Sequence, residues 1–140
     1  MFEDLLINPW SVAGCTVFGM ALGALWYSPF LFGKLWVRLS GASQDGVEKA
    51  KKSGMGPAYA GTLLNCAVMS LLLAFFLDRV GAYDVVEGLI VASLLWLGFV
   101  VTVLFSAVLW ERKPLLLFFV MAGHYLVFLL AASVLLMLFQ

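Results

Sequence analysis

The chain has few charged residues, and long parts of it have none. It contains 8 Lys or Arg and 8 Asp or Glu, so 11% of its 140 residues are charged, against about 25% in a soluble domain. Charge is absent from residues 5–33, 53–77, 88–110 and 114–140. Each of these stretches is long enough to cross a bilayer as a helix. The composition excludes a soluble globular domain and predicts a polytopic integral membrane protein of the all-α class.

Net charge and cysteine are also scarce. The formal net charge is zero, which argues against a nucleic-acid partner, for which a basic patch with many phosphate contacts is expected. The two cysteines, Cys15 and Cys66, both fall inside charge-free stretches, where a cysteine is expected to pack as a small apolar residue. We therefore expect no disulfide, no metal site and no cofactor.

Catalytic motifs are missing as well. The sequence has no HExxH, no nucleophile elbow, no phosphate loop and no paired carboxylates within an apolar stretch, although these are the patterns that identify common catalytic sites. A catalytic interpretation would depend on His124, the one histidine. We expect no enzymatic activity and assign no catalytic residue.

The four apolar stretches predict a single membrane domain over residues 1–140 that forms an antiparallel four-helix bundle. A transmembrane helix needs about 20 residues, which places a loop at about 31–57 and the spans at about 9–30, 58–77, 86–109 and 115–138.

Basic residues are distributed unevenly between the loops. The first and third loops carry seven of the eight Lys and Arg residues, namely Lys34, Arg38, Lys49, Lys51, Lys52, Arg112 and Lys113, and Arg79 lies in the second. Cytoplasmic loops carry the excess of Lys and Arg. The pattern predicts cytoplasmic first and third loops and places both termini outside.

The first span carries small residues at every fourth position: Ser11, Cys15, Gly19 and Gly23. Gly19 and Gly23 form a GxxxG motif, which lets another helix approach closely. Two interpretations stay open, which are tight packing within one subunit and an interface between subunits.

An amphipathic segment is expected where the first span ends. Pro29 ends or kinks the helix, and Lys34 and Arg38 then alternate with apolar residues at helical spacing, as in a segment that lies on a membrane surface. Ser43 is a candidate cap for a further short helix. Lys34 and Arg38, together with Lys49, Lys51 and Lys52, are the expected contacts to anionic lipid headgroups.

Short motifs in this region resemble a known family. Trp26-Tyr27-Ser28-Pro29 followed by Phe32-Gly33-Lys34-x-Trp36, then Trp96-Leu97-Gly98-Phe99, Glu111-Arg112-Lys113-Pro114 and Tyr125, are similar to the motifs of DUF1761, a family of small bacterial membrane proteins. The resemblance covers essentially the whole chain. It implies four membrane helices and no established biochemical activity. Together with the helical rather than barrel-strand spans, it implies the bacterial inner membrane.

Asn65 and His124 are the most polar side chains of the predicted spans. Both lie a few residues to the cytoplasmic side of the span midpoint, about 4 Å at helical rise, and Gly23 and Thr102 fall slightly deeper, so the four residues are a candidate polar layer. Ionisable residues at such depth are functional candidates; a histidine, with an ordinary pKa near 6.5, is suited to sensing protons. In the alternative interpretation, Asn65 and His124 only hydrogen-bond to neighbouring helices.

Aromatic residues offer a second candidate site. Trp26, Tyr27, Trp96 and Tyr125 are candidates to line a site for an apolar or cationic solute, although aromatics in spans more often pack or form interfacial belts.

Two functions remain from sequence. The first is a small channel or transporter for a small solute or ion, assembled as a homo-oligomer. The second is a structural or accessory membrane protein that packs with partner helices or binds anionic lipid.

Overall fold

The computed structural model describes residues 4–140, and the secondary structure of this part is entirely helical. Helices α1 (Pro9–Trp26), α4 (Gly56–Val80) and α7 (Leu115–Leu138) are continuous, and the third long helix runs through α5 (Val85–Leu95), the π-helix η1 (Trp96–Val101) and α6 (Thr102–Trp110). All four are long and apolar enough to cross a membrane. The predicted all-α class with four span-like helices is confirmed.

Short polar residues and a glycine set the ends of these helices. The Asn8 side chain caps α1 by accepting a hydrogen bond from the Trp10 amide at 3.0 Å, and Asp84 caps α5 by accepting one from the Glu87 amide at 2.9 Å. Gly81 ends α4 in the left-handed conformation, with φ of 74°, which glycine adopts without steric cost.

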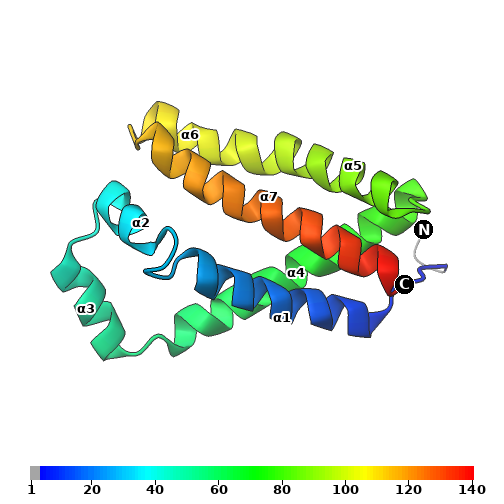
Figure 1. The fold of residues 1–140 in the computed structure, drawn as a ribbon, viewed down its shortest axis with the longest axis horizontal. Coiled ribbons are helices and arrows are strands. Elements are labelled where there is room, and N and C mark those ends of the chain that lie inside the picture. Colours follow the sequence, from blue (N-terminus) through cyan, green and yellow to red (C-terminus); the bar gives the residue numbers. More distant parts are fainter. Residues whose placement is uncertain (1–3) are drawn as a thin grey trace.

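Helix α7 is the centre of the bundle, because it packs on α1, α4, α5 and α6. The start of α1, the C-terminus and the α4–α5 turn lie at one end of the molecule, which we call the terminal end (Figure 1). The opposite end, which we call the basic end, holds the α6–α7 turn and two short helices, α2 (Gly33–Ser40) and α3 (Gln44–Ser53). Long helices that are consecutive in the chain therefore run antiparallel, whereas α4 and α7 run parallel.

Hydrogen bonds join segments that are distant in sequence at both ends. At the terminal end, Ser11 Oγ donates to the Phe139 carbonyl at 2.6 Å. At the basic end, Lys113 Nζ donates to the Ser40 carbonyl at 3.4 Å.

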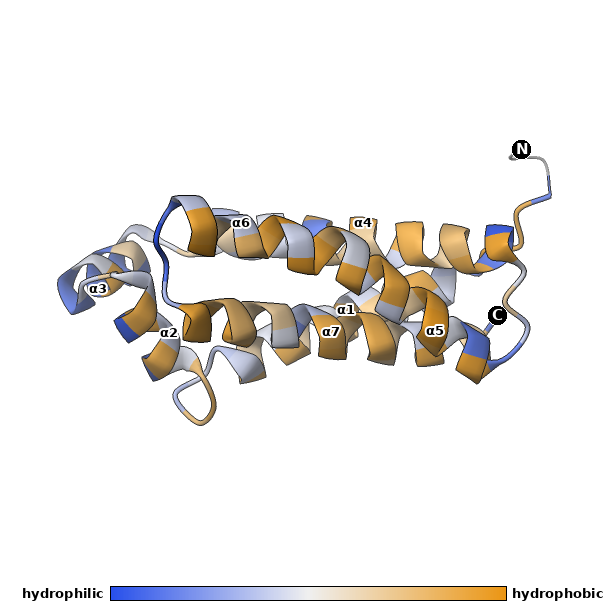
Figure 2. Ribbon diagram, turned by 90° about the horizontal axis from the view of Figure 1, so that it is seen from above, coloured by the Kyte–Doolittle hydropathy of each residue, from blue (hydrophilic) through white to orange (hydrophobic). Residues whose placement is uncertain are grey.

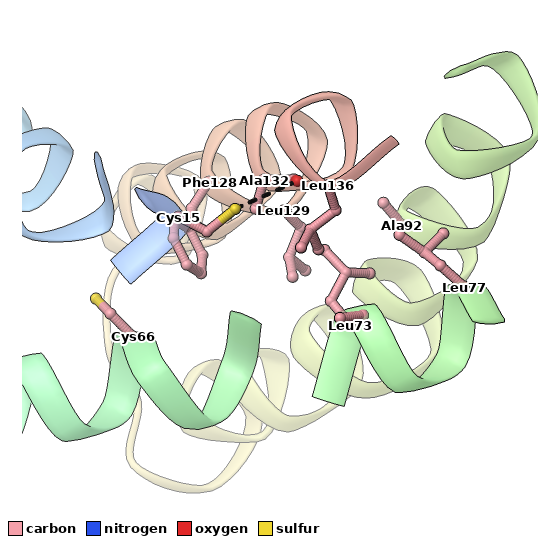
Figure 3. Packing of buried hydrophobic residues seen from close by; sticks show 10 residues of the cluster. Cys15, Cys66, Leu73, Leu77, Ala92, Phe128, Leu129, Ala132 and Leu136 are labelled. Atoms are coloured by element: carbon pink, nitrogen blue, oxygen red, sulfur yellow. Dashed lines mark hydrogen bonds between the residues drawn. The ribbon is translucent and has the colours of Figure 1, made fainter. Parts of the chain in front are cut away.

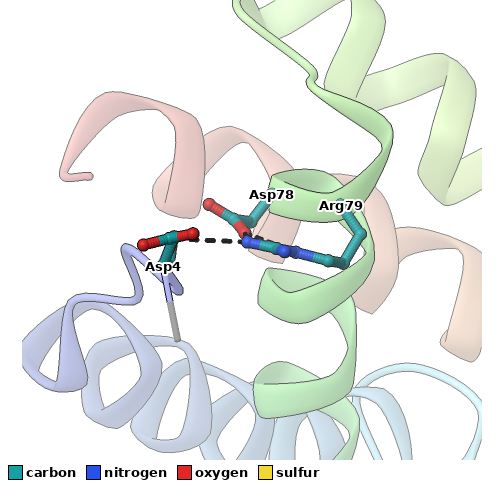
Figure 4. Close-up of polar contacts among 3 residues, drawn as sticks. All are labelled: Asp4, Asp78 and Arg79. Carbon is teal, nitrogen blue, oxygen red and sulfur yellow. Dashed lines mark hydrogen bonds and ion pairs between the residues drawn. The ribbon is translucent and has the colours of Figure 1, made fainter. Parts of the chain in front are cut away.

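Charge lies at the two ends, and the bodies of the long helices are mostly apolar (Figure 2). The terminal end holds Arg79, whose guanidinium forms an ion pair with Asp78 and donates to the Asp4 carbonyl at 3.3 Å (Figure 4). The other seven Lys and Arg residues belong to α2, α3 or the α6–α7 turn.

The core lies where α1, α4 and α5 meet α7 (Figure 3). Cys15 and Cys66 are both buried and free, and Cys15 Sγ donates to the Ala132 carbonyl at 3.6 Å. A Cβ added to Gly19 would lie 2.6 Å from Phe128 Cε2 and 2.8 Å from Cys66 Sγ. A side chain at position 19 would therefore have to displace Phe128 or Cys66 where α1 packs against α4 and α7.

The first long helix ends earlier than predicted. The sequence predicts a span to about residue 30, but α1 ends at Trp26 and turns occupy residues 27–32. The turns are closed by hydrogen bonds from the Phe32 amide to the Trp26 carbonyl at 2.9 Å and from the Gly33 amide to the Ser28 carbonyl at 3.0 Å. The chain thus leaves the helix before Pro29.

The predicted amphipathic segment corresponds to α2, on which Lys34 and Arg38 are exposed while Leu35 and Trp36 are half-buried. The expected cap of the next short helix is confirmed, because Ser43 Oγ accepts a hydrogen bond from the Gly46 amide at 3.0 Å.

Candidate functional site

The break between α1 and α2 lies alongside the body of α7. At 1.5 Å per residue, the 18 residues of α1 span about 27 Å and the 24 residues of α7 about 36 Å. His124, about 14 Å from the first residue of α7 at that rise, contacts Trp26, the last residue of α1, and Tyr27, which follows it. Helix α2 then packs on α7. The first apolar stretch is therefore discontinuous at the level of His124.

Aromatic rings surround the His124 imidazole. Its ring centroid lies 5.9 Å from that of Trp26, 5.3 Å from that of Tyr27 and 5.0 Å from that of Tyr125. A Cβ added to Gly23 would lie 3.8 Å from His124 Nε2, so Gly23 borders the same space. We call His124 with Trp26, Tyr27 and Tyr125 the histidine box.

The two nitrogens of His124 are buried and have no hydrogen-bond partner among residues 4–140. Buried polar atoms in native proteins are nearly always paired, so an unpaired one requires an explanation. The box therefore encloses a buried polar ring that has no hydrogen-bond partner among the described residues.

Two tryptophans hold α7 in position next to this box. Trp26 Nε1 donates to the Val120 carbonyl at 3.1 Å, and Trp96 Nε1 donates to the Ala122 carbonyl at 2.8 Å. A Cβ added to Gly123 would lie 3.4 Å from Trp26 Cζ2, so the indole lies directly on the α7 backbone. Of the four aromatic residues predicted to line a site, three belong to the box and Trp96 braces α7 from η1.

The four residues of the predicted polar layer do not come together within the chain. His124 and Gly23 are neighbours, but Asn65 and Thr102 are exposed on α4 and α6. Thr102 Oγ1 donates to the Gly98 carbonyl of its own helix at 2.7 Å. Residues at equal depth on two helices face each other only if both helices are rotated suitably about their axes. Successive residues point in directions about 100° apart around a helix. Asn65 accordingly faces outward while the next residue, Cys66, faces the core.

The four residues of the small stripe on α1 line its contact with the rest of the chain. Ser11, Cys15 and Gly19 are buried and Gly23 is half-buried. The groove at Gly19 is filled by Phe128 and Cys66 of the same chain.

The predicted headgroup contacts lie at the basic end, where their side chains are exposed: Lys34, Arg38, Lys49, Lys51 and Lys52. Lys113 of the α6–α7 turn also reaches α2 through Ser40, and Arg112 is exposed beside it. Sequence reasoning placed the first and third loops on the same side of the membrane but did not include Arg112 and Lys113 among the headgroup contacts.

The π-helix η1 was also missed. It begins at Trp96 and ends just before Thr102, and single π-helical turns within α-helices frequently occur at functional sites. Apolar periodicity carries no signal for it, because every residue from 94 to 101 except Gly98 is large and apolar.

Comparison with known proteins agrees with the sequence motifs. A family model described as "Protein of unknown function (DUF1761)" matches residues 10–137, which confirms the resemblance over nearly the whole chain. No curated protein and no solved structure matches this chain.

Proposed function

The chain belongs to the DUF1761 family, and from this premise we propose that it is a channel or transporter for a small solute or ion, with the histidine box as its site. The observation that carries the proposal is the break in the first apolar stretch next to the unpaired nitrogens of His124. Discontinuous helices form the binding sites of many transporters, because irregular backbone inside a membrane is tolerated only in protein or around water.

Positive charge is the favoured cargo. His124 is the one histidine, and ionisable residues at membrane depth commonly mark ion or proton pathways. The rings of Trp26, Tyr27 and Tyr125 favour a cation at this position. The proposed cargo is a proton or a small organic cation, and the proposed role is not enzymatic.

The proposed location is the bacterial inner membrane, with the basic end in the cytoplasm and both termini outside. The support is the excess of Lys and Arg at the basic end, which is typical of cytoplasmic loops.

Flux through purified protein tests the proposal. Proteoliposomes are compared with protein-free liposomes for entry of protons and of tetramethylammonium at about pH 5.5 and about pH 7.5, on either side of the ordinary histidine pKa. We expect flux that changes with pH in the wild-type protein and no pH dependence in His124→Leu. Thr102→Val, which removes an exposed hydroxyl from α6, is the matched control and should behave as wild type.

Two results would count against the site. An unchanged pH profile in His124→Leu would exclude His124 as the proton-sensitive group. Flux equal to that of protein-free liposomes for both probes would reject transport of these cargoes.

The alternative function is a structural or accessory role without transport. It is favoured by the exposed basic residues Lys34 and Arg38 on α2 and Arg112 in the α6–α7 turn, since basic clusters beside membrane helices bind anionic headgroups. Measurements of thermal stability and flux in liposomes with and without phosphatidylglycerol distinguish the accessory role from transport. The accessory role predicts increased thermal stability with anionic lipid and no flux.

A further inference from the structure

Half of α4 is not covered by the rest of the chain. Every residue from 56 to 65 is exposed, whereas the remainder of α4 contributes Cys66, Ser70, Leu73, Ala74 and Leu77 to the core. The uncovered half and α6 lie at opposite edges of the molecule (Figure 1). We call residues 56–65 the free half of α4.

An apolar helix surface can be covered by lipid tails alone, but the free half ends at Asn65, whose carboxamide needs hydrogen-bond partners. Asn65 lies about 14 Å from the first residue of α4 and about 22 Å from the last at helical rise, which places it within the hydrocarbon if the helix spans the membrane. Among the described residues, its side chain has one hydrogen bond, from Nδ2 to Met69 Sδ at 3.9 Å. A thioether is a weak acceptor, so the amide is poorly satisfied.

The threonine hydroxyls at similar depth do not have this problem. Thr62 Oγ1 donates to the Ala58 carbonyl at 2.8 Å, and Thr102 bonds its own helix in the same way. Asn65 is therefore the exposed polar group in α4 that most needs a partner from outside the chain. Lipid tails have no hydrogen-bonding groups, whereas asparagine side chains hydrogen-bond across membrane helices.

A second copy of this chain fits this surface. A carboxamide has both donors and an acceptor, so two Asn65 side chains facing each other across a two-fold axis satisfy one another, as in an isologous dimer. One turn away on the same face, a Cβ added to Gly61 would meet nothing within 4 Å, which leaves room for a close helix approach. Val68 and Leu72, 45% and 50% exposed, continue this face.

We infer that two copies associate through the free half of α4, with Asn65 pairing with Asn65 and the helices crossing close to Gly61. The inference does not depend on transport, because it concerns a surface on α4 and not the histidine box.

Energy transfer between donor- and acceptor-labelled full-length protein in vesicles, measured as the protein-to-lipid ratio falls, tests the inference. Asn65→Leu removes the amide at similar volume, and Gly61→Leu adds bulk where the single chain has space. Gly98→Leu is the matched control, because a Cβ at this exposed glycine of η1 also meets nothing within 4 Å. We expect wild-type dimers, a dissociation constant raised about tenfold in Asn65→Leu, a comparable or larger increase in Gly61→Leu, and no change in Gly98→Leu.

Three outcomes would overturn the inference. They are a wild-type protein that stays monomeric at all ratios, a dimer that persists unchanged in Asn65→Leu and Gly61→Leu, and a dimer weakened equally by Gly98→Leu. Circular dichroism and thermal unfolding of each variant establish that the substituted chains are folded as the wild type is.

Discussion

At the scale of single residues, two glycines that look equivalent in the sequence have different surroundings in the structure. Gly14 and Gly19 lie in the same helix, α1. A Cβ at Gly14 would meet nothing within 4 Å, but one at Gly19 would press on the ends of Phe128 and Cys66. Phe128 is itself only 2% exposed, so it has little room to move. The packing density of α1 against the bundle therefore depends on Gly19 and not on Gly14.

We expect Gly19→Ala and Gly14→Ala to change stability in opposite directions. Alanine is favoured over glycine in a helix by up to about 1 kcal/mol, and Gly14→Ala should keep this gain. Gly19→Ala adds overpacking that destabilises by about 1–3 kcal/mol. The free energy of unfolding, measured by denaturant titration in mixed micelles, checks this. Equal stability of the two variants would show that α1 packs differently.

At the scale of secondary-structure elements, the break after α1 depends on one close backbone contact. A Cβ added to Gly33 would collide with the Tyr27 carbonyl oxygen and would lie 2.8 Å from the Ser28 carbonyl oxygen. Both atoms are backbone, and the Ser28 carbonyl accepts the Gly33 amide hydrogen bond at 3.0 Å. The chain cannot relieve this collision by rotating a side chain.

We therefore expect Gly33→Ala to open the break and loosen α2. The expected destabilisation is about 1–3 kcal/mol, with faster amide hydrogen exchange in Gly33–Ser40 than in α7. Gly56→Ala is the matched control, since a Cβ there meets nothing within 4 Å. Exchange in α2 that is the same in both variants would contradict this account.

The elements also show what sequence can and cannot predict here. The charge-free stretches predict four long helices because the bilayer length and backbone hydrogen bonding leave few alternatives. Pro29 indicates that the first helix ends nearby, but the end at Trp26 depends on the turns at residues 27–32, which hydropathy does not encode.

The sequence also predicts only part of the candidate site, because it does not show how each helix is rotated. His124 and its aromatic neighbours were selected as two separate groups, because depth along a helix can be counted in sequence whereas rotation cannot. Rotation brings Trp26, Tyr27 and Tyr125 to His124 and turns Asn65 outward. It is set by packing such as that at Gly19, where the neighbours come from α4 and α7.

At the scale of the whole molecule, the separation of charge between the two ends is the dominant feature. Seven Lys and Arg residues lie in α2, α3 or the α6–α7 turn. The eighth, Arg79, is paired with Asp78 at the terminal end. Arg79 is thus compensated locally, while the basic end presents exposed Lys34, Arg38 and Arg112. The excess of Lys and Arg in short loops sets orientation in a membrane.

We expect this asymmetry to hold the basic end in the cytoplasm when the chain is expressed in a bacterium. Alkaline phosphatase, which is active only outside the cytoplasm, should be active when fused after Gln140, and green fluorescent protein, which folds in the cytoplasm, should be dark there. The same reporters inserted at Gly54, between α3 and α4, should give the reverse pattern. A fluorescent fusion after Gln140 would mean that the local pairing of Arg79 and the excess of Lys and Arg at the basic end do not govern insertion.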